Sequence, residues 1–304
     1  MISQRATAFV PGHVTAFFSA HPAERPAVAG SRGAGLTLTD GVTVRVSPPD
    51  ETASSPARTV DGDPGTIGAV EDVLSALGLA ERDRPDPGRT ADTVGDGGVV
   101  VAIESDLPIG AGFGVSGAAA LGVALAANEA FDRGRSENEL IRIAHEAEVS
   151  RGTGLGDVVA QARGGIPIRL EPGAPGFGEL DGIPARARVE YVTFGELSTE
   201  AILGGDTTAL SAAGERALDR LRDDPRLPTL MAAAREFADD AELLVPAVAE
   251  AIEAVEAAAD GDVDGAAMAM LGRTVFALGT GLSDAGYDPA VCQTHSSGAR
   301  LVEQ

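Results

Sequence analysis

A glycine-rich stretch, Ser105 to Ala127, carries the residues with the clearest capacity for chemistry in this sequence. Gly110, Gly112 and Gly114 alternate with apolar residues after Pro108 and lead into a run of small helix-forming residues. Alternate glycines let a backbone take positive φ angles and approach another group closely. The unpaired amides and the positive dipole at the start of the next helix attract an anion, typically a phosphate. The stretch therefore predicts a phosphate-binding loop, in preference to a turn that needs glycine only for tight packing.

Two common phosphate loops do not fit this stretch. A Walker loop requires Gly-Lys-Ser/Thr, and the chain contains no lysine. Residues 112–117 spell GxGxxG, but a dinucleotide fold places that run directly after its strand. Here the apolar strand predicted over 99–103 is followed by residues 106–111 before the run begins. The loop therefore belongs to another class of phosphate-binding protein.

Carboxylates on the next segments are candidates for a site. Ser136 and Glu139 form a capping-box pattern that starts a helix. At about 100° per residue, Glu148 lies at the edge of the apolar face of this helix, whereas Glu146 points away. A half-buried Glu148 needs a partner. After a second glycine-rich loop, Asp157 begins another helix, and its residue type alone would suit a helix N-cap.

Further candidates lie near the N-terminus and after Asp157. His13 follows Pro11-Gly12 between two predicted short strands, and a satisfied turn histidine is an equal alternative. Ser31 and Arg32 lie in a glycine cluster that can hold a carboxylate or a hydroxyl group. Arg169 is close in sequence to Asp157, with a surface salt bridge as its alternative.

The remaining pattern predicts two domains, 1–180 and 181–304. Residues 36–46 alternate around Asp40-Gly41, which predicts a hairpin. Helical spacing predicts a helix over 67–79. The second half is rich in Ala and Glu, and we expect helices over 206–221, 227–239, 244–258 and 263–278. The fold class expected is α+β, with a mixed β/α first domain and a largely helical second domain.

Composition limits the class of partner and the environment. The formal net charge is −23, with 46 acidic residues and 23 basic residues, all arginine. Such a surface repels nucleic acid and anionic membranes, so neither is expected as a partner. Acidity without lysine predicts a protein adapted to concentrated salt. One cysteine, Cys292, allows no intrachain disulfide, and no signal peptide or membrane span is expected, so the sequence predicts a cytoplasmic protein.

The phosphate loop resembles the Pro-x-x-x-Gly-Leu-Gly-Ser-Ser-Ala-Ala signature of the GHMP kinases. Five residues are in register: Pro108, Gly112, Gly114, Ser116 and Ala118. Phe113, Val115 and Gly117 depart from the signature. The resemblance implies a two-domain GHMP-kinase-like fold that uses ATP and Mg²⁺. The implied ATP-binding residues are Pro108, Gly110, Gly112, Gly114, Ser116 and Gly117.

The same resemblance assigns roles to the carboxylates. GHMP kinases of the mevalonate-kinase type place a magnesium-binding Glu on a helix, then a small-residue loop, then a catalytic Asp. Glu148 and Asp157 match that order, with Ser116 as a second magnesium ligand and Glu146 as the fallback by spacing. The family also has a third glycine-rich motif, for which 279–283 and 297–300 are the candidates, and neither matches well.

The whole set of motifs resembles the archaeal branch of GHMP kinases that phosphorylates pantoate on the route to coenzyme A. This resemblance implies (R)-pantoate as the small-molecule substrate and 4-phosphopantoate as the product, with Ser31, Arg32, His13 and Arg169 as substrate-binding residues. His13 stands where GHMP kinases have a lysine. We expect a haloarchaeal source. A homodimer is one assembly that the sequence allows. A kinase for homoserine, shikimate or mevalonate stays open, as does a nucleotide-binding regulator without turnover.

The charge composition leads to a prediction about stability in salt. The self-repulsion of the excess negative charges is screened as the Debye length falls to about 3 Å at 1 M salt. The melting temperature should therefore rise from dilute buffer to molar KCl, measured by circular dichroism. A flat or falling melting temperature over that range would contradict the adaptation to salt.

Overall fold

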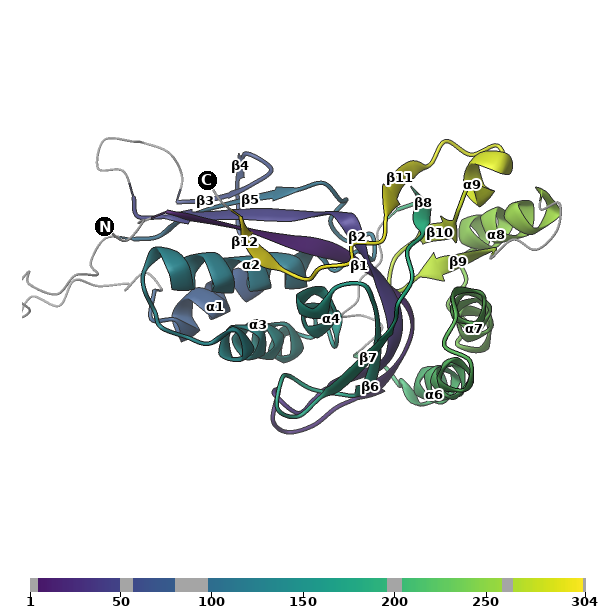
Figure 1. The fold of residues 1–304 in the computed structure, drawn as a ribbon, viewed down its shortest axis with the longest axis horizontal. Coiled ribbons are helices and arrows are strands. Elements are labelled where there is room, and N and C mark those ends of the chain that lie inside the picture. The colour runs from purple at the N-terminus through teal and green to yellow at the C-terminus, as the bar shows by residue number, and fades with distance from the viewer. Residues whose placement is uncertain (1–4, 50–56, 80–97, 196–203, 259–264, 303–304) are drawn as a thin grey trace, which may run out of the picture.

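The computed structural model describes residues 5–49, 57–79, 98–195, 204–258 and 265–302 (Figure 1). These residues form two β-sheets with helices packed on each. The first sheet has eight strands in the order β12-β1-β2-β5-β3-β4, with β6 paired to β2 and β7 paired to β6. Its strands are β1 (Ala6–His21), β2 (Gly30–Ser47), β3 (Arg58–Val60), β4 (Asp63–Pro64), β5 (Val100–Ser105), β6 (Ile166–Glu171), β7 (Glu179–Ile183) and β12 (Arg300–Val302).

Four helices lie on one side of the first sheet (Figure 1). They are α1 (Gly68–Ala76), α2 (Val115–Ala130), α3 (Glu137–Arg151) and α4 (Asp157–Arg163). Helix α2 is buried nearly all round, as its apolar sequence predicts. Gly122 allows it to pack closely on the sheet, because a Cβ there would lie 2.6 Å from Val44 Cγ2. The loop before α2 is thereby fixed between a central strand and a buried helix.

Strands β1 and β2 form one long antiparallel pair, and this corrects two predictions. The two short strands expected around Pro11-Gly12-His13 are a single strand. The hairpin expected at Asp40-Gly41 does not exist, since β2 continues through it and Gly41 pairs with Pro11. The register then shifts, and His13 pairs with Thr37. A bulge explains the glycine, because a Cβ at Gly41 would lie 2.3 Å from the Val10 carbonyl oxygen.

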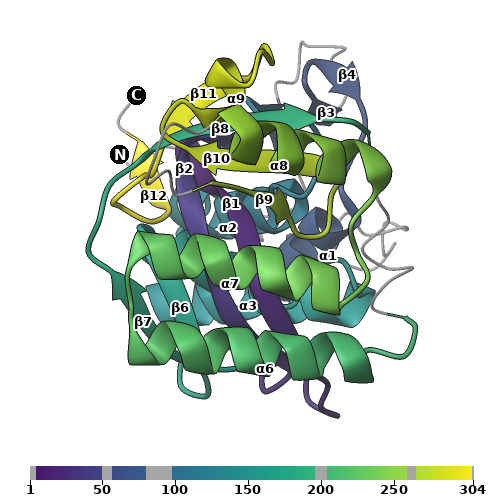
Figure 2. The same cartoon turned by 90° about the vertical axis from the view of Figure 1, so that its right-hand side faces the viewer.

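The second sheet has four strands in the order β11-β8-β10-β9. Its strands are β8 (Arg188–Thr193), β9 (Ala266–Ala269), β10 (Thr274–Leu278) and β11 (Ala290–Gln293). The helices of this part are α6 (Thr208–Asp223), α7 (Leu227–Asp240), α8 (Pro246–Ala258) and α9 (Gly281–Asp284). In Figure 2, α8 lies in front of β9 and β10, and α7 and α6 continue toward the protruding end of β1 and β2. No helix in the described ranges is long and apolar enough to cross a membrane.

Three helices of the second half are confirmed to within a few residues, but the helix predicted over 263–278 is wrong. Its described residues form β9, a turn at Gly272, and β10. Both strands are completely buried. A fully apolar segment has no exposed face, so its periodicity does not distinguish a buried strand from a buried helix.

The chain passes between the two sheets twice. It leaves the first sheet after β7 and returns in β12, which pairs with β1. The two connecting segments are hydrogen-bonded to each other: the Thr294 amide donates to the Ala187 carbonyl oxygen, and the Ala187 amide donates to Thr294 Oγ1, both at 3.0 Å. The domain boundary predicted at residue 180 lies within β7, a strand of the first sheet.

Candidate active site

The predicted phosphate loop connects β5 to α2, and its backbone has the expected geometry. Gly110, Gly112 and Gly114 have φ angles of 78°, 93° and 64°. Gly114 is the N-cap of α2, so the first amides of the helix, including that of Ser116, have no partner within the helix. The loop can therefore present several N–H groups to an anion.

Three hydrogen bonds hold this loop from three different elements. Gln161 of α4 donates to the Gly114 carbonyl oxygen at 2.9 Å. Thr274 of β10 donates its hydroxyl proton to the Ala111 carbonyl oxygen at 2.8 Å. The His13 amide of β1 donates to the Phe113 carbonyl oxygen at 3.0 Å. The surrounding fold thus fixes the backbone conformation of this loop.

A cleft opens beside the loop and collects most of the predicted site residues. Along its walls lie Gly110, Gly112, Gly114, Ser116, Ser31, Glu148, Asp157 and Arg169. Four predicted residues are not among the lining residues: Pro108, Gly117, Arg32 and His13. Pro108 and Gly117 flank the loop, whereas Arg32 and His13 have other partners, described below.

Glu148 of α3 is the carboxylate that enters the cleft, and Glu146 is not among the lining residues. The predicted capping box is present, with the Ser136 hydroxyl accepting from the Glu139 amide. Glu148 is buried, and Ser116 donates to its Oε1 at 2.5 Å. Burial raises the pKa of Glu148 to about 7. A bound cation would favour the ionised form, so this pair fits a magnesium site.

The donor set suits Mg²⁺ rather than a metal held by protein alone. Among the described residues, no three His, Cys, Asp or Glu side chains gather into a metal cluster. Mg²⁺ commonly takes one or two carboxylates and completes its coordination with substrate phosphates and water. The Glu148 carboxylate of α3 accepts from Ser116 in the first turn of α2, where the phosphates of a nucleotide would sit.

Asp157 is the first residue of α4 and lies beside the phosphate loop, since a Cβ at Gly114 would be 3.2 Å from Asp157 Oδ1. The N-cap of this helix is Gly156, and no side chain caps it, so the N-cap alternative for Asp157 is wrong. Asp157 Oδ1 lies 2.8 Å from Nδ1 of His13. Burial raises the pKa of Asp157, but the bond from His13 and the charge of Arg169 outweigh it, so the net pKa is below its ordinary value. The carboxylate is therefore ionised and can accept a proton.

Arg169 of β6 is buried, with 1% of its surface exposed, and it lines the cleft. Its Nε and Nη1 atoms have no hydrogen-bond partner. Burial lowers the pKa of Arg169 to about 10, so the group still carries its charge at neutral pH. A buried cation with two unpaired donor nitrogens is strongly destabilising unless an anion meets it. A carboxylate is such an anion, and guanidinium groups form strong charge-assisted hydrogen bonds with carboxylates.

Ser31 lies beside Arg169, and a glycine permits this arrangement. A Cβ at Gly156 would lie 2.4 Å from Ser31 Oγ and 2.6 Å from Arg169 Nε. Both Ser31 and Arg169 therefore reach the cleft only because position 156 has no side chain. Together they provide a hydroxyl group and a cation for a small polar anion.

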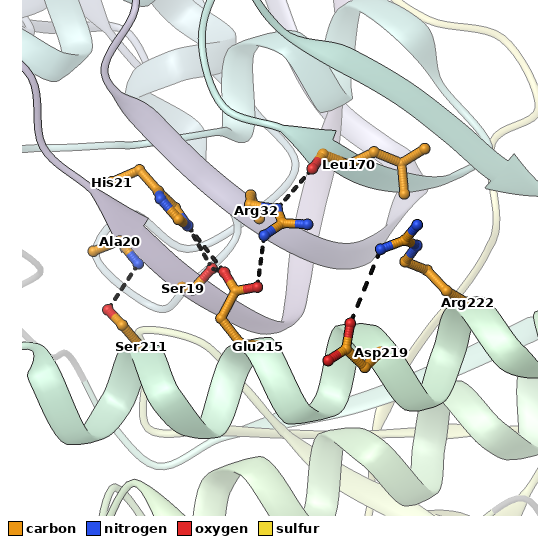
Figure 3. Close-up of polar contacts among 9 residues, drawn as sticks. All are labelled: Ser19, Ala20, His21, Arg32, Leu170, Ser211, Glu215, Asp219 and Arg222. Carbon is orange, nitrogen blue, oxygen red and sulfur yellow. Dashed lines mark hydrogen bonds and ion pairs between the residues drawn. The ribbon is translucent and has the colours of Figure 1, made fainter.

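Arg32 points away from this cleft, contrary to the expectation that it binds substrate. Its Nε donates to the Leu170 carbonyl oxygen at 2.7 Å, and its Nη1 donates to Glu215 of α6 at 2.7 Å (Figure 3). Glu215 also accepts from Ser19 and contacts His21. Successive side chains of a strand point to opposite faces, so Ser31 and Arg32 cannot both enter one cleft. Arg32 instead joins α6 to the pair β1–β2.

The turn between β9 and β10 is a part of the cleft that the sequence analysis missed. Met270 and Leu271 line the cleft. Gly272 lies against the phosphate loop, because a Cβ at Gly272 would be 2.1 Å from the Ala111 carbonyl oxygen. The segments 279–283 and 297–300, the candidates for a third motif, do not line the cleft. Gly272 is the sequence signal that could have identified the turn.

Comparisons with known proteins agree with this geometry. The family model "GHMP kinases N terminal domain" matches residues 75–165. Pantoate kinase of Thermococcus kodakarensis is 36% identical over 89% of this chain and 86% of that protein. Pantoate kinase of Methanospirillum hungatei is 32% identical over 90% of this chain and 88% of that protein. A solved "phosphotransferase related to CoA biosynthesis pathway" is 30% identical, with a TM-score of 0.80 and 98% of each chain covered.

The buried state of Glu148 leads to a prediction about stability. Because its pKa is raised to about 7 from 4.5, the folded protein holds this proton more tightly than the unfolded chain. The resulting stabilisation is complete below the unfolded pKa and is lost as the pH rises through 7. The Glu148→Gln variant stays neutral at every pH. Its free energy of unfolding should therefore rise relative to that of the wild type by on the order of 3 kcal/mol from pH 5 to pH 8.

Urea unfolding of both proteins in EDTA at the two pH values measures this difference. Glu146→Gln, on the same helix but outside the cleft, is the matched control. If the difference in unfolding free energy between Glu148→Gln and the wild type does not change with pH, the pKa of Glu148 is not raised in the metal-free protein.

Proposed function

This chain belongs to the pantoate kinase family of the GHMP kinases, and we propose that it transfers the γ-phosphoryl group of ATP to (R)-pantoate, forming 4-phosphopantoate for coenzyme A synthesis. The observation that carries the substrate assignment is Arg169, a buried cation with two unpaired donor nitrogens in the wall of the cleft. Pantoate is a hydroxy acid, and its carboxylate is the partner that this guanidinium lacks. Ser31 would hold a hydroxyl group or the second carboxylate oxygen.

The phosphate loop would hold the ATP phosphates. Its exposed N–H groups and the start of α2 provide the positive end of a helix dipole. Ser116 and Glu148 would hold Mg²⁺, which neutralises phosphate charge when bound. The turn containing Met270 and Leu271 forms a wall of the same cleft and would help exclude water from it.

Asp157 would act on the attacking hydroxyl group. Phosphoryl transfer depends mainly on positioning and on stabilisation of charge, so one carboxylate that orients the hydroxyl and accepts its proton is sufficient. With the carboxylate of pantoate on Arg169, the primary hydroxyl can be directed toward Asp157 and the phosphate loop, which lie beside each other in the cleft wall.

Two other functions remain as outcomes of the tests. A kinase for homoserine, shikimate or mevalonate would use the same loop with a different acceptor. A nucleotide-binding regulator would bind ATP without turnover, although the presence of both Glu148 and Asp157 argues against it. The lysine-free, acidic composition supports an enzyme working in concentrated salt, as a haloarchaeal source would require, and the single cysteine supports a reducing cytoplasm.

The substrate assignment predicts a selective effect of Arg169→Ala. A hydrogen bond to a charged group contributes about 1.5–3 kcal/mol, so kcat/KM for pantoate should fall roughly ten- to hundredfold, chiefly through KM. The KM for ATP should change little. Steady-state kinetics in molar KCl with Mg-ATP measures both constants.

Arg32→Ala is the matched control for this experiment. It removes an arginine on the neighbouring strand that contacts Glu215 instead of lining the cleft, so the KM for pantoate should stay near the wild-type value. Unchanged pantoate kinetics in Arg169→Ala would overturn the carboxylate assignment. A wild type that ignores pantoate and phosphorylates an uncharged alcohol would overturn the pantoate assignment but not the kinase class.

Asp157→Asn should reduce kcat about a hundredfold or more, because a positioned base acts mainly in the transition state. The affinity for Mg-ATP, measured by calorimetric titration, should change little. The amide oxygen can still accept from His13, and Asp157 caps no helix, so the melting temperature should also change little. A variant that melts early but turns over normally when folded would show that Asp157 is only structural.

A further inference from the structure

We propose that His13 is a positioning residue that orients Asp157 and fixes its place relative to the phosphate loop. This inference rests on the proposed function, since it concerns how the attacking hydroxyl and the transferred phosphate are aligned. It assigns His13 a role through Asp157, in place of the direct contact with substrate expected from the sequence.

The hydrogen bond between His13 and Asp157 has a defined direction. His13 is completely buried, and its Nδ1 lies 2.8 Å from Asp157 Oδ1. An ionised carboxylate can only accept, so Nδ1 carries the proton and donates it to this bond. The Oδ2 atom lies toward Gly154, a residue of the cleft wall. The bond therefore restrains rotation of the carboxylate and keeps its second oxygen directed toward the cleft wall, where a substrate hydroxyl would lie.

The backbone of the same residue holds the phosphate loop. The His13 amide donates to the Phe113 carbonyl oxygen at 3.0 Å. His13 and Thr37 form a non-hydrogen-bonded pair of the β1–β2 ladder, because the Thr37 amide and carbonyl bond to Gly165 and His295, so the His13 amide points away from β2. One residue thus bonds to both sides of the reaction centre, with its amide on the loop and its ring on Asp157. A shift of His13 would move the two partners relative to each other.

His13 has no route to the substrate itself. It is not among the residues that line the cleft. Its second ring nitrogen, Nε2, is buried without a partner. That nitrogen faces Gly35 of β2, where a Cβ would lie only 2.5 Å away. Burial also lowers the pKa of His13, so the ring is neutral and offers no charge to a carboxylate substrate.

The two ring nitrogens allow a discriminating experiment. The side-chain nitrogen of asparagine occupies the position of histidine Nδ1, whereas that of glutamine reaches the position of Nε2. His13→Asn should therefore keep kcat within about threefold of the wild type, while His13→Gln and His13→Ala should lose roughly ten- to hundredfold in kcat. The KM values for pantoate and ATP should stay within about threefold in all three variants.

A double substitution tests whether His13 acts through Asp157. In an Asp157→Ala background, the further change His13→Ala should have almost no effect on the residual kcat. His21→Asn, a histidine of the same strand outside the cleft, is the control for general damage to β1. Calorimetric titration with Mg-ATP verifies that each variant is folded and binds nucleotide.

The outcomes separate this inference from the proposed function. A wild type without pantoate-dependent turnover in this assay would refute the proposed function. With an active wild type, equal kcat values for His13→Asn and His13→Gln would overturn the positioning role, even if His13→Ala fails to fold. A loss that appears in KM for pantoate, or that multiplies with Asp157→Ala, would mean that His13 acts on the substrate directly.

Discussion

The cleft depends on keeping three ionisable side chains largely out of water within one small volume. Glu148 and Arg169 are buried in its wall, Asp157 is partly buried there, and each is compensated only in part by the protein. Asp157 is hydrogen-bonded to His13. Glu148 has only neutral hydroxyl partners, and its pKa of about 7 lies close to neutral pH. Two nitrogen atoms of Arg169 have no hydrogen-bond partner. Each incomplete compensation corresponds to a group that a kinase substrate would bring: a proton, a divalent cation and a carboxylate. The stability lost in the empty protein is recovered as binding affinity.

The sheet and the glycine loops make this concentration of charge sterically feasible. Gly156 leaves room for Arg169 and Ser31, and Gly154 leaves room for Glu148, whose Oε2 would lie 2.8 Å from a Cβ there. A single extra carbon at either position would force a charged side chain of the cleft to shift. Gly154 and Gly156 therefore serve side-chain packing, whereas Gly110, Gly112 and Gly114 of the phosphate loop serve backbone conformation. The same residue type has two different functions in neighbouring loops.

Features set by local sequence could be predicted, and features set by distant contacts could not. The phosphate loop, the capping box of α3 and the inward direction of Glu148 follow from short-range spacing, and the structure has all three. Strand alternation should also have separated Ser31 from Arg32, since neighbouring residues on a strand face opposite sides.

The bond between His13 and Asp157 joins residues 144 positions apart, and no local pattern signals it. The sequence pattern also could not show that β9 and β10 are strands and not a helix, because their burial comes from the helices and strands that surround them.

The two connections between the sheets restrict how the second part of the molecule can move. A unit attached by one linker can turn about any axis, but a unit attached by two adjacent, mutually hydrogen-bonded segments cannot twist. The pairing of Ala187 with Thr294 makes such a double attachment at one edge. The turn beside the cleft is fastened to the first sheet as well, because the Met270 amide donates to the Thr15 carbonyl oxygen and the Thr274 hydroxyl donates to the Ala111 carbonyl oxygen. The two sheets are therefore tied together both at the chain crossings and at the wall of the cleft, so a displacement of one sheet against the other must break hydrogen bonds at both places.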